Sequence, residues 1–271
     1  MPSYAITGAS RGIGWEFLRQ LSSDSNNTVI AIVRNKASTE VKVATELSGR
    51  PNIHIVQGDL VDYAALQNAA VGTAKITGGG LDYLIANAGL VTQFDAYDPI
   101  GVLGQKPEVL EKGLMDCFRV NVVGNIHLFN LFMPLILKGQ VKKIIAISSG
   151  QADLEVIPKL KIQVASAYSI AKAGLNTAVA KFSAQYSDDG VLFMSICPGM
   201  VDTGHYNDVT EEQMKGLQKM LAAFVEYAPD FKGPSPPESA VKDVISVIEK
   251  ASVENGNGGT FVSHYGNKQW L

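Results

Sequence analysis

Two side chains suited to proton transfer, Tyr168 and Lys172, stand four residues apart in a stretch expected to be helical. Positions i and i+4 lie one helical turn apart, so the phenol and the ammonium group share a face. A phenol ionises near pH ~10, and a cation held beside it favours the phenolate and lowers that pKa. The pair could therefore donate and accept a proton near neutral pH. The same spacing also occurs on ordinary solvated helix faces, so the pair gains its weight from other parts of the chain.

A glycine-rich segment, GASRGIG at residues 8–14, follows a short buried strand at residues 3–7 and opens a helical stretch. Strand, glycine turn and helix N-terminus in this order form a seat for a dinucleotide pyrophosphate, because the helix amides attract phosphate. Gly8 permits the tight turn, Gly12 lets the backbone approach phosphate, and Gly14 lets the helix pack on the sheet. The segment therefore predicts a dinucleotide cofactor.

Residues 8–12 also spell G-x-S-x-G, the nucleophile elbow of α/β-hydrolases. That elbow belongs after a central strand with several strands before it, whereas only seven residues precede Gly8. A hydrolase also needs a late histidine beside an acid, but His264 lies in a terminal strand and turn with no acid after it. We therefore favour dinucleotide binding over an esterase.

Composition limits the classes of protein to consider. The 271 residues are 46% hydrophobic and 18% charged, which suits one large α/β domain with a covered core. A net charge of -3 gives no general attraction to nucleic acid or to an anionic membrane. We expect a cytoplasmic protein, because we find no leader-like segment and no apolar run of bilayer length. Cys117 and Cys197 are expected to be reduced structural residues, and no metal site is predicted from the histidine and cysteine spacing.

Strands alternate with helices along the chain, which predicts a parallel sheet covered on both faces. The expected strands, mostly continuous Val, Ile and Leu runs, are 3–7, 28–33, 53–56, 81–86, 141–147, 191–196 and 259–263. Helices are expected near 13–24, 62–76, 108–137, 167–187 and 238–251. This order predicts a single Rossmann-type, doubly wound domain over residues 1–271 with a seven-stranded sheet.

Two segments interrupt the alternation, at residues 92–107 and 205–237. Both follow strand ends on the carboxyl edge of the sheet, where ligands bind in this architecture. The second segment contains an amphipathic piece that is rich in Met and Leu. It is either a helix packed on the core or a substrate lid near 205–237, and both readings stay open.

Together these motifs resemble the short-chain dehydrogenase/reductase family, in its short, single-domain, carbonyl-reductase-like branch, and the resemblance covers essentially the whole chain. It implies a catalytic tetrad of Asn121, Ser149, Tyr168 and Lys172. It also implies cofactor contacts from the glycine loop, an adenine-side pair, a motif after the fourth strand, the Tyr and Lys, and a nicotinamide-flanking segment. These residues are Gly8, Ser10, Arg11, Gly12, Ile13, Gly14, Arg34, Asp59, Leu60, Asn87, Ala88, Gly89, Tyr168, Lys172, Pro198, Gly199, Val201 and Thr203.

The resemblance assigns each tetrad residue a role. Tyr168 is the general acid, and Lys172 lowers its pKa and binds the nicotinamide ribose. Ser149 holds the substrate oxygen; Ser148 competes for this role, but the family pattern favours the second serine. Asn121 is a poor helix former in mid-helix, so it is either a tolerated polar residue or the support for a water that feeds protons to Lys172.

The choice of cofactor depends on the end of the second strand. NAD-binding folds place an acid there to bind the ribose 2′-hydroxyl, whereas this chain has Arg34-Asn35. Arg11 supplies a second guanidinium from the glycine loop, and two such groups favour a 2′-phosphate. We therefore expect NADP(H), used as NADPH, unless Arg34 only solvates the strand end. Asp59 either binds on the adenine side or caps the next helix.

These features predict an NADPH-dependent reductase of a ketone or aldehyde on a hydrophobic small molecule. The alternative is a catalytically silent NADP-binding regulator or scaffold. A sugar-nucleotide epimerase would need a larger C-terminal domain than the 72 residues after Gly199 provide. Residues 150–166 exceed the usual length of the family's corresponding loop, so we expect a pocket wall particular to this protein.

Association is expected from the long helix near 108–137, which is apolar around much of its circumference and needs cover on several sides. The neighbouring helix near 167–187 is rich in alanine, which permits close approach. The resemblance implies that these helices pair with their two-fold mates, giving a homodimer or homotetramer. The lid or the segment after Asn87 could instead cover the same surface within one subunit.

Overall fold

The predicted parallel sheet is present, with seven strands in the order β3-β2-β1-β4-β5-β6-β7. The computed structural model describes residues 1–204 and 209–271 of the chain. Every neighbouring pair of strands is parallel, and the order reverses between β1 and β4. The strands are β1 (Ser3–Thr7), β2 (Thr28–Val33), β3 (Ile53–Gln57), β4 (Tyr83–Ala86), β5 (Lys143–Ile147), β6 (Leu192–Cys197) and β7 (Phe261–Ser263).

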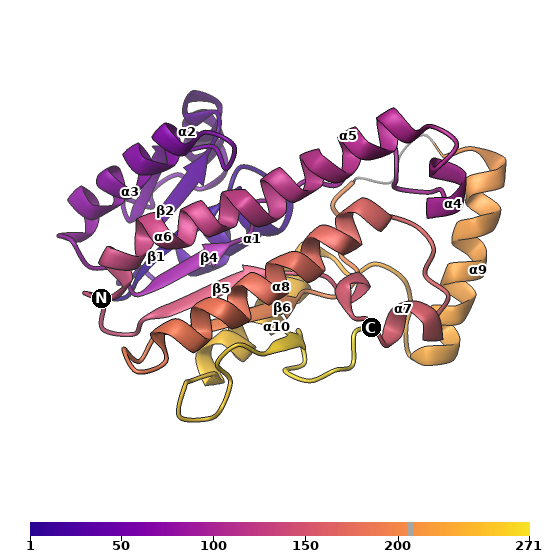
Figure 1. Cartoon of the computed structure of the whole chain (residues 1–271). Coiled ribbons are helices and arrows are strands. Elements are labelled where there is room, and N and C mark those ends of the chain that lie inside the picture. Colours follow the sequence, from indigo (N-terminus) through magenta and orange to yellow (C-terminus); the bar gives the residue numbers. More distant parts are fainter. Residues whose placement is uncertain (205–208) are drawn as a thin grey trace.

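Helices cover both faces of the sheet, which confirms the predicted single, doubly wound α/β domain (Figure 1). The α-helices of the described residues are α1 (Gly12–Leu21), α2 (Lys36–Glu46), α3 (Tyr63–Thr77), α4 (Ile100–Leu103), α5 (Pro107–Phe118), α6 (Gly124–Ile136), α7 (Val156–Lys159), α8 (Ser166–Tyr186), α9 (Glu211–Tyr227) and α10 (Pro237–Lys250). A π-helical segment, η1 (Arg119–Val123), and a 3-10 turn, η2 (Gly150–Ala152), complete the set.

Alternation along each strand divides the core into two layers. Ile30 and Ile32 of β2 pack with α3, α6 and α8, whereas Val29, Ala31 and Val33 point to the opposite layer with α1 and α10. Both layers are built from Ile, Leu, Val and Phe side chains with almost no exposure. Within residues 1–204 and 209–271, no helix combines the length and apolar character needed to cross a membrane.

The helical prediction needs two main corrections, besides the short helices α4 and α7, which it did not contain. α2 was not anticipated, because Thr39 is its only buried residue and its sequence carries no apolar stripe. The single helix expected near 108–137 consists of α5, the π-helical segment and α6 in direct succession. A π-turn inserts an extra residue into the helical repeat, and such turns often occur at functional sites. Asn121 lies in the middle of this one.

The segment between β6 and α10, called the excursion below, has its two ends joined by backbone hydrogen bonds. The amide of Asp202 donates to the Ser235 carbonyl at 2.9 Å, and the Ser235 amide donates to the Met200 carbonyl at 2.8 Å. Residues 205–208, the start of the predicted lid, lie outside the described residues. The remainder of the excursion contains α9, which begins with a Thr210–Gln213 capping box and stands beyond the strand ends beside α4 and α7 (Figure 1).

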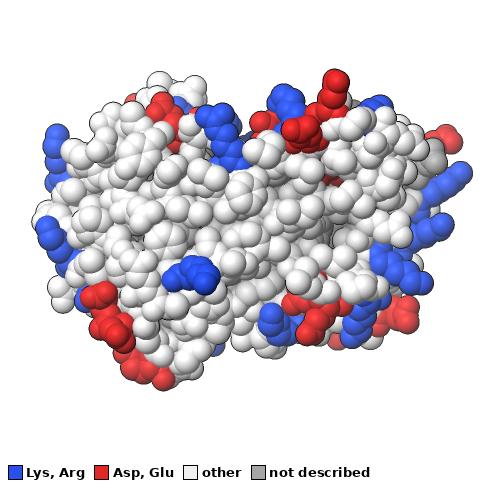
Figure 2. Space-filling model, viewed as in Figure 1, with Lys and Arg blue, Asp and Glu red and all other residues white. Residues whose placement is uncertain are grey.

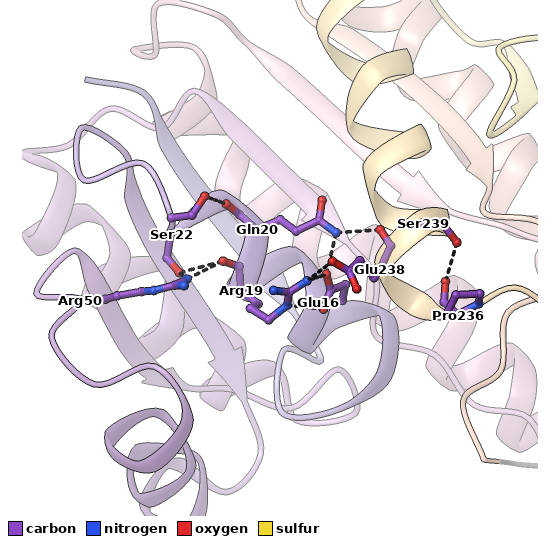
Figure 3. A network of polar contacts seen from close by, with 9 residues as sticks. Glu16, Arg19, Gln20, Ser22, Arg50, Pro236, Glu238 and Ser239 are labelled. Atoms are coloured by element: carbon purple, nitrogen blue, oxygen red, sulfur yellow. Dashed lines mark hydrogen bonds and ion pairs between the residues drawn. The ribbon is translucent and has the colours of Figure 1, made fainter.

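A polar network then fixes the start of α10 to α1 (Figure 3). The buried Glu16 carboxylate accepts hydrogen bonds from Arg19 Nε at 2.7 Å and from Gln20 Nε2 at 2.6 Å. Arg19 also pairs with the Glu238 carboxylate at 3.2 Å, while Gln20 donates to the Glu238 carbonyl at 2.8 Å. The chain that returns from the excursion is therefore attached to the helix that begins at the glycine loop.

Candidate active site

A cavity of about 490 Å³ opens at the carboxyl edge of the sheet. One end is formed by the glycine loop and the end of β2, and the other by the end of β5, α7, α8 and α9. It lies where the strand order reverses, the position at which open α/β sheets bind ligands. Of the predicted site residues, all but Asn121 and Gly14 line this cavity.

Tyr168 and Lys172 face each other on α8, as the spacing predicted. The Lys172 ammonium nitrogen lies 5.6 Å from the centre of the Tyr168 ring. Lys172 Nζ also donates to the Ile147 carbonyl at 2.6 Å, which holds it at the end of β5. Burial lowers the pKa of Lys172 to about 8, while the thiols of Cys197 and Cys117 act in the opposite direction. Lys172 is therefore still mostly cationic at pH 7.

The first turn of α8 is held by Asp95, a residue that the sequence analysis did not identify. Its buried carboxylate accepts from the amides of Ala167 at 2.7 Å and Tyr168 at 3.4 Å, and the Thr92 hydroxyl donates to it. A negative charge at a helix N-terminus is favourable, because the helix dipole is positive there. Asp95 comes from the irregular segment after β4, so no local pattern could have linked it to α8.

Both candidate serines line the cavity. The Ser149 hydroxyl accepts from the Gln151 amide at 3.3 Å and is half-buried. Ser148 is buried, and its hydroxyl has no hydrogen-bond partner within the described part of the chain. Ser149 is thus the more accessible of the two hydroxyls, and its role stays a prediction.

Both polar atoms of the Asn121 side chain bond to the backbone of Leu90, and Asn121 is not among the described residues that line the cavity. Its side-chain oxygen accepts from the Leu90 amide at 2.9 Å, and its side-chain nitrogen donates to the Leu90 carbonyl at 2.9 Å. A Cβ added at Gly89 would lie 2.9 Å from Asn121 Oδ1 and 3.5 Å from Lys172 Nζ. The side chain therefore fixes the loop after β4 beside Lys172, and a role in proton supply remains a prediction.

The glycine loop has the geometry that a pyrophosphate requires. Gly8 and Gly12 have φ of +69° and +55°, a region that side chains disfavour. A Cβ on Gly14 would collide with the Gly8 carbonyl oxygen, so Gly14 serves the packing of α1 on the sheet. A Cβ on Gly12 would lie 3.5 Å from Thr203 Cγ2, so the loop faces the segment after β6 across the cavity. These residues fit a dinucleotide.

The loop is tied to the motif after β4 by Thr7. Its hydroxyl accepts from the amides of Asn87 at 3.1 Å and Ala88 at 3.0 Å, and the Asn87 side chain donates to the Thr7 carbonyl at 3.0 Å. The ends of β1 and β4 are therefore held together on both sides of the topological reversal. The helix cap considered for Asp59 is instead made by Asp62, whose side chain accepts from the Ala65 amide at 3.0 Å.

The far wall of the cavity is apolar and comes from segments that the sequence analysis could not connect. It comprises Val156, Leu160, Ile162, Met220, Phe224, Trp270 and Leu271. The segment after β7 supports this wall: Trp270 packs against Gly150, and Lys268 pairs with Asp153 at 3.4 Å. The long 150–166 segment thus contains η2 and α7, and residues 268–270 hold it in place through these two contacts.

Both cysteines are buried and unpaired, as expected. The Cys197 sulfur accepts from the Gly150 amide at 3.0 Å and from the Gly199 amide at 3.4 Å, so it connects the loops after β5 and β6. Burial raises the pKa of this thiol. The described residues contain no group of three or more His, Cys, Asp or Glu placed to hold a metal ion.

Comparison with known proteins agrees with this geometry. A family model described as short chain dehydrogenase matches residues 3–214. The chain is 62% identical to short chain dehydrogenase virK of Hypocrea virens and 53% identical to short-chain dehydrogenase/reductase iacC of Pestalotiopsis fici, covering 100% of all three chains. Among solved structures, the NADPH-bound carbonyl reductase from chicken fatty liver superposes with a TM-score of 0.77 at 23% identity. Carbonyl reductase Sniffer of D. melanogaster gives 0.76 at 23%, and each match covers 98% of both chains.

Proposed function

Because this chain belongs to the short-chain dehydrogenase/reductase family, we propose that it reduces a ketone or aldehyde on a hydrophobic small molecule to the alcohol, with NADPH as the cofactor. One observation carries the proposal. Tyr168, Lys172 and two serines meet at one end of a cavity whose other end is the glycine loop. A side chain that can donate a proton and a loop suited to bind a dinucleotide thus line the same cavity.

In the proposed reaction the bound nicotinamide supplies the hydride that the carbonyl carbon accepts. Ser149 binds the carbonyl oxygen and orients it. The Tyr168 hydroxyl transfers its proton to that oxygen as negative charge develops, and the alcohol forms. The phenolate left on Tyr168 is stabilised by the Lys172 ammonium and is then reprotonated from solvent.

NADPH is preferred to NADH because of the charges near the end of β2. Arg34 occupies the place where an NAD-binding fold carries an acid, and Arg11 lines the same part of the cavity. Asp59 is the only acidic side chain among the described cavity-lining residues, and it accepts from the Val61 amide at 3.2 Å. A guanidinium group at the place of the NAD-binding acid, with a second one on the glycine loop, suits a 2′-phosphate.

The opposite wall of the cavity supports the proposed class of substrate. Met220 and Phe224 of α9 line the cavity together with Trp270, and all are large and apolar. A ketone on an aromatic, polyketide-like or steroid-like body would bury its surface there. The segment near 205–237 would act as the lid through α9, although its residues 205–208 are outside the described part of the chain.

A homodimer, or a tetramer built from dimers, is part of the proposal. The face crossed by α5, α6 and α8 shows few charged side chains at its centre (Figure 2). Most apolar residues of the long helical segment are buried or partly buried within the subunit, but Met115 and Phe118 of α5 and Ile170 of α8 remain exposed. These three side chains would pack against a second copy.

The test is a screen of aromatic and polycyclic ketones, with the oxidation of NADPH followed by absorbance. In Tyr168→Phe, turnover of an accepted ketone should fall by ~10²–10⁴, because the ring is kept and only the proton is lost. Affinity for NADPH should be nearly unchanged. Tyr186→Phe, on the same helix but away from the cavity, should keep normal turnover.

Wild-type turnover by Tyr168→Phe would refute the assigned acid. The catalytically silent alternative predicts a different result, in which NADPH binds but no ketone in the panel is reduced.

A further inference from the structure

Lys42 of α2 reaches back to the glycine loop. Its ammonium nitrogen lies 3.3 Å from the Ser10 carbonyl oxygen and 4.0 Å from the centre of the Trp15 ring on α1. Hydrogen bonding and cation–π attraction thus hold one lysine against two other elements. An ordinary surface lysine has no such constraint. These two contacts set the position of the charge beside Ser10.

Two further cations, Arg11 and Arg34, line the cavity, while Lys42 contacts the loop from outside the residues that line it. Arg11 follows Ser10 directly, and Arg34 lines the cavity at the end of β2. None of the ion pairs between described residues includes Arg11, Arg34 or Lys42. Lys36, on the same helix as Lys42, does pair with Glu40 at 3.7 Å. Like charges placed close together repel each other, and a bound anion would offset this repulsion.

We infer that Lys42 is a third binding residue for the 2′-phosphate of NADPH, beside Arg11 and Arg34. The inference rests on the cofactor proposed above. An ammonium group has three N–H donors. One N–H donates to the Ser10 carbonyl, and the Trp15 ring contacts the ammonium group on one side. The remaining N–H donors can bind a phosphate oxygen. The pyrophosphate belongs at the N-terminus of α1, so the phosphate nearest the end of β2 is the one on the ribose.

NADH and NADPH separate this role from a purely structural one. NADH lacks the 2′-phosphate but occupies the same loop, so a residue that only supports the loop would affect both cofactors. Binding is measured by calorimetry on the full chain without substrate, for wild type, Lys42→Met, Lys42→Arg and Arg34→Ala. Lys36→Met is the matched control, because it removes an already paired charge from the same helix.

Lys42→Met should weaken NADPH binding by about tenfold, the loss typical of a charge-assisted hydrogen bond, and leave NADH binding within about twofold. Its NADPH affinity should also depend less on salt, because one contact between opposite charges is removed. Lys42→Arg should restore the preference. Arg34→Ala should show the same selectivity for NADPH, and Lys36→Met should change neither cofactor.

Two results would overturn the inference alone: equal weakening of both cofactors by Lys42→Met, or no weakening of either, while wild type and Arg34→Ala behave as expected. Equal affinity of the wild type for NADPH and NADH would overturn the proposed cofactor, and the inference with it. The two failures are therefore distinguishable within one set of titrations.

Discussion

Lys172 shows how burial sets the chemistry of a single residue at this site. The side chain is 3% exposed, and burial lowers the pKa of its ammonium from 10.5 to about 8. The two neighbouring thiols, Cys197 and Cys117, favour the charged form but do not offset the loss of hydration. The Ile147 carbonyl accepts a hydrogen bond from Lys172 Nζ at 2.6 Å. The residue is thus a cation at neutral pH that loses its charge earlier than an exposed lysine.

This value predicts the pH dependence of carbonyl reduction. Above about pH 8 the free enzyme loses the Lys172 charge that stabilises the Tyr168 phenolate, so kcat/KM should fall as pH rises. The measurement is kcat/KM for an accepted ketone from pH ~6 to ~10. In Lys172→Arg the side chain keeps its charge throughout, so the alkaline fall should move to higher pH in whatever activity remains. A profile that stays flat beyond pH ~9 in the wild type would contradict this role.

At the scale of elements, α8 depends on a carboxylate that comes from another part of the chain. Asp95 bonds the amides of Ala167 and Tyr168, and its backbone carbonyl accepts from the Ala165 amide at 2.7 Å. Ala165 itself has φ of +55°, so the chain turns sharply before the helix begins. The start of the helix that carries Tyr168 and Lys172 is therefore fixed by a residue from another part of the chain.

Asp95→Ala should destabilise the protein by about 1–3 kcal/mol, because buried amides lose their acceptor. A loss of this size should lower Tm by several degrees, and turnover should fall as well, since Tyr168 lies in the freed turn. Asp188→Ala, which removes an exposed acid just beyond the other end of α8, is the control and should change neither quantity. Thermal melting and ketone reduction measure the two effects, and a Tm equal to the wild type would contradict the capping role.

The elements differ in how far sequence could predict them. Continuous apolar runs identified most of the strands, because a parallel strand is buried on both faces and needs such a run. α2 carries no comparable signal, since one buried residue gives no stripe. As a result Lys42 could not be placed beside the glycine loop from the sequence.

The same limit applies to the site. Motifs at strand ends, such as Thr7–Gly14 and Asn87–Gly89, were predictable because the carboxyl edge of a parallel sheet brings them together. Asp95 and Trp270 were not, because neither belongs to a local pattern and each acts through a contact far away in the sequence. The π-turn at Asn121 was also hidden, because its residues fit an ordinary helix equally well.

At the scale of the whole molecule, three segments together build the apolar wall of the cavity: residues 150–166, the excursion containing α9 and the segment after β7. The network of Glu16, Arg19 and Glu238 fastens the end of the excursion to α1, on the side of the sheet opposite α8 (Figure 3). α9 therefore covers the cavity from a base that is anchored at Ser235 and again at α10. Among the described residues, the part of the excursion beyond Thr203 lines the cavity only through Met220 and Phe224 of α9.

The face crossed by α5 and α8 is a second feature at this scale, because it leaves apolar side chains exposed. The two helices approach closely at Gly174, where an added Cβ would lie 3.2 Å from Val122 Cγ2 and 3.5 Å from Phe118 Cε2. Outside this contact Met115 is 62% exposed and Ile170 is 50% exposed. Burying apolar area of this kind against a second copy releases about 25 cal/mol per Å², which favours a symmetric pair of the two helices.

Light scattering at micromolar concentration should therefore give the mass of a dimer or tetramer. Met115→Glu should shift that mass toward the 29.0 kDa monomer, because two charges would face each other or lose hydration at the two-fold contact. Met214→Glu is the matched control: this methionine is 44% exposed but belongs to α9, which is not part of the proposed contact, so the assembly should persist. A monomer mass for the wild type would refute the association. An unchanged assembly in Met115→Glu would place the interface on another face, because a carboxylate in a buried apolar contact costs several kcal/mol per subunit.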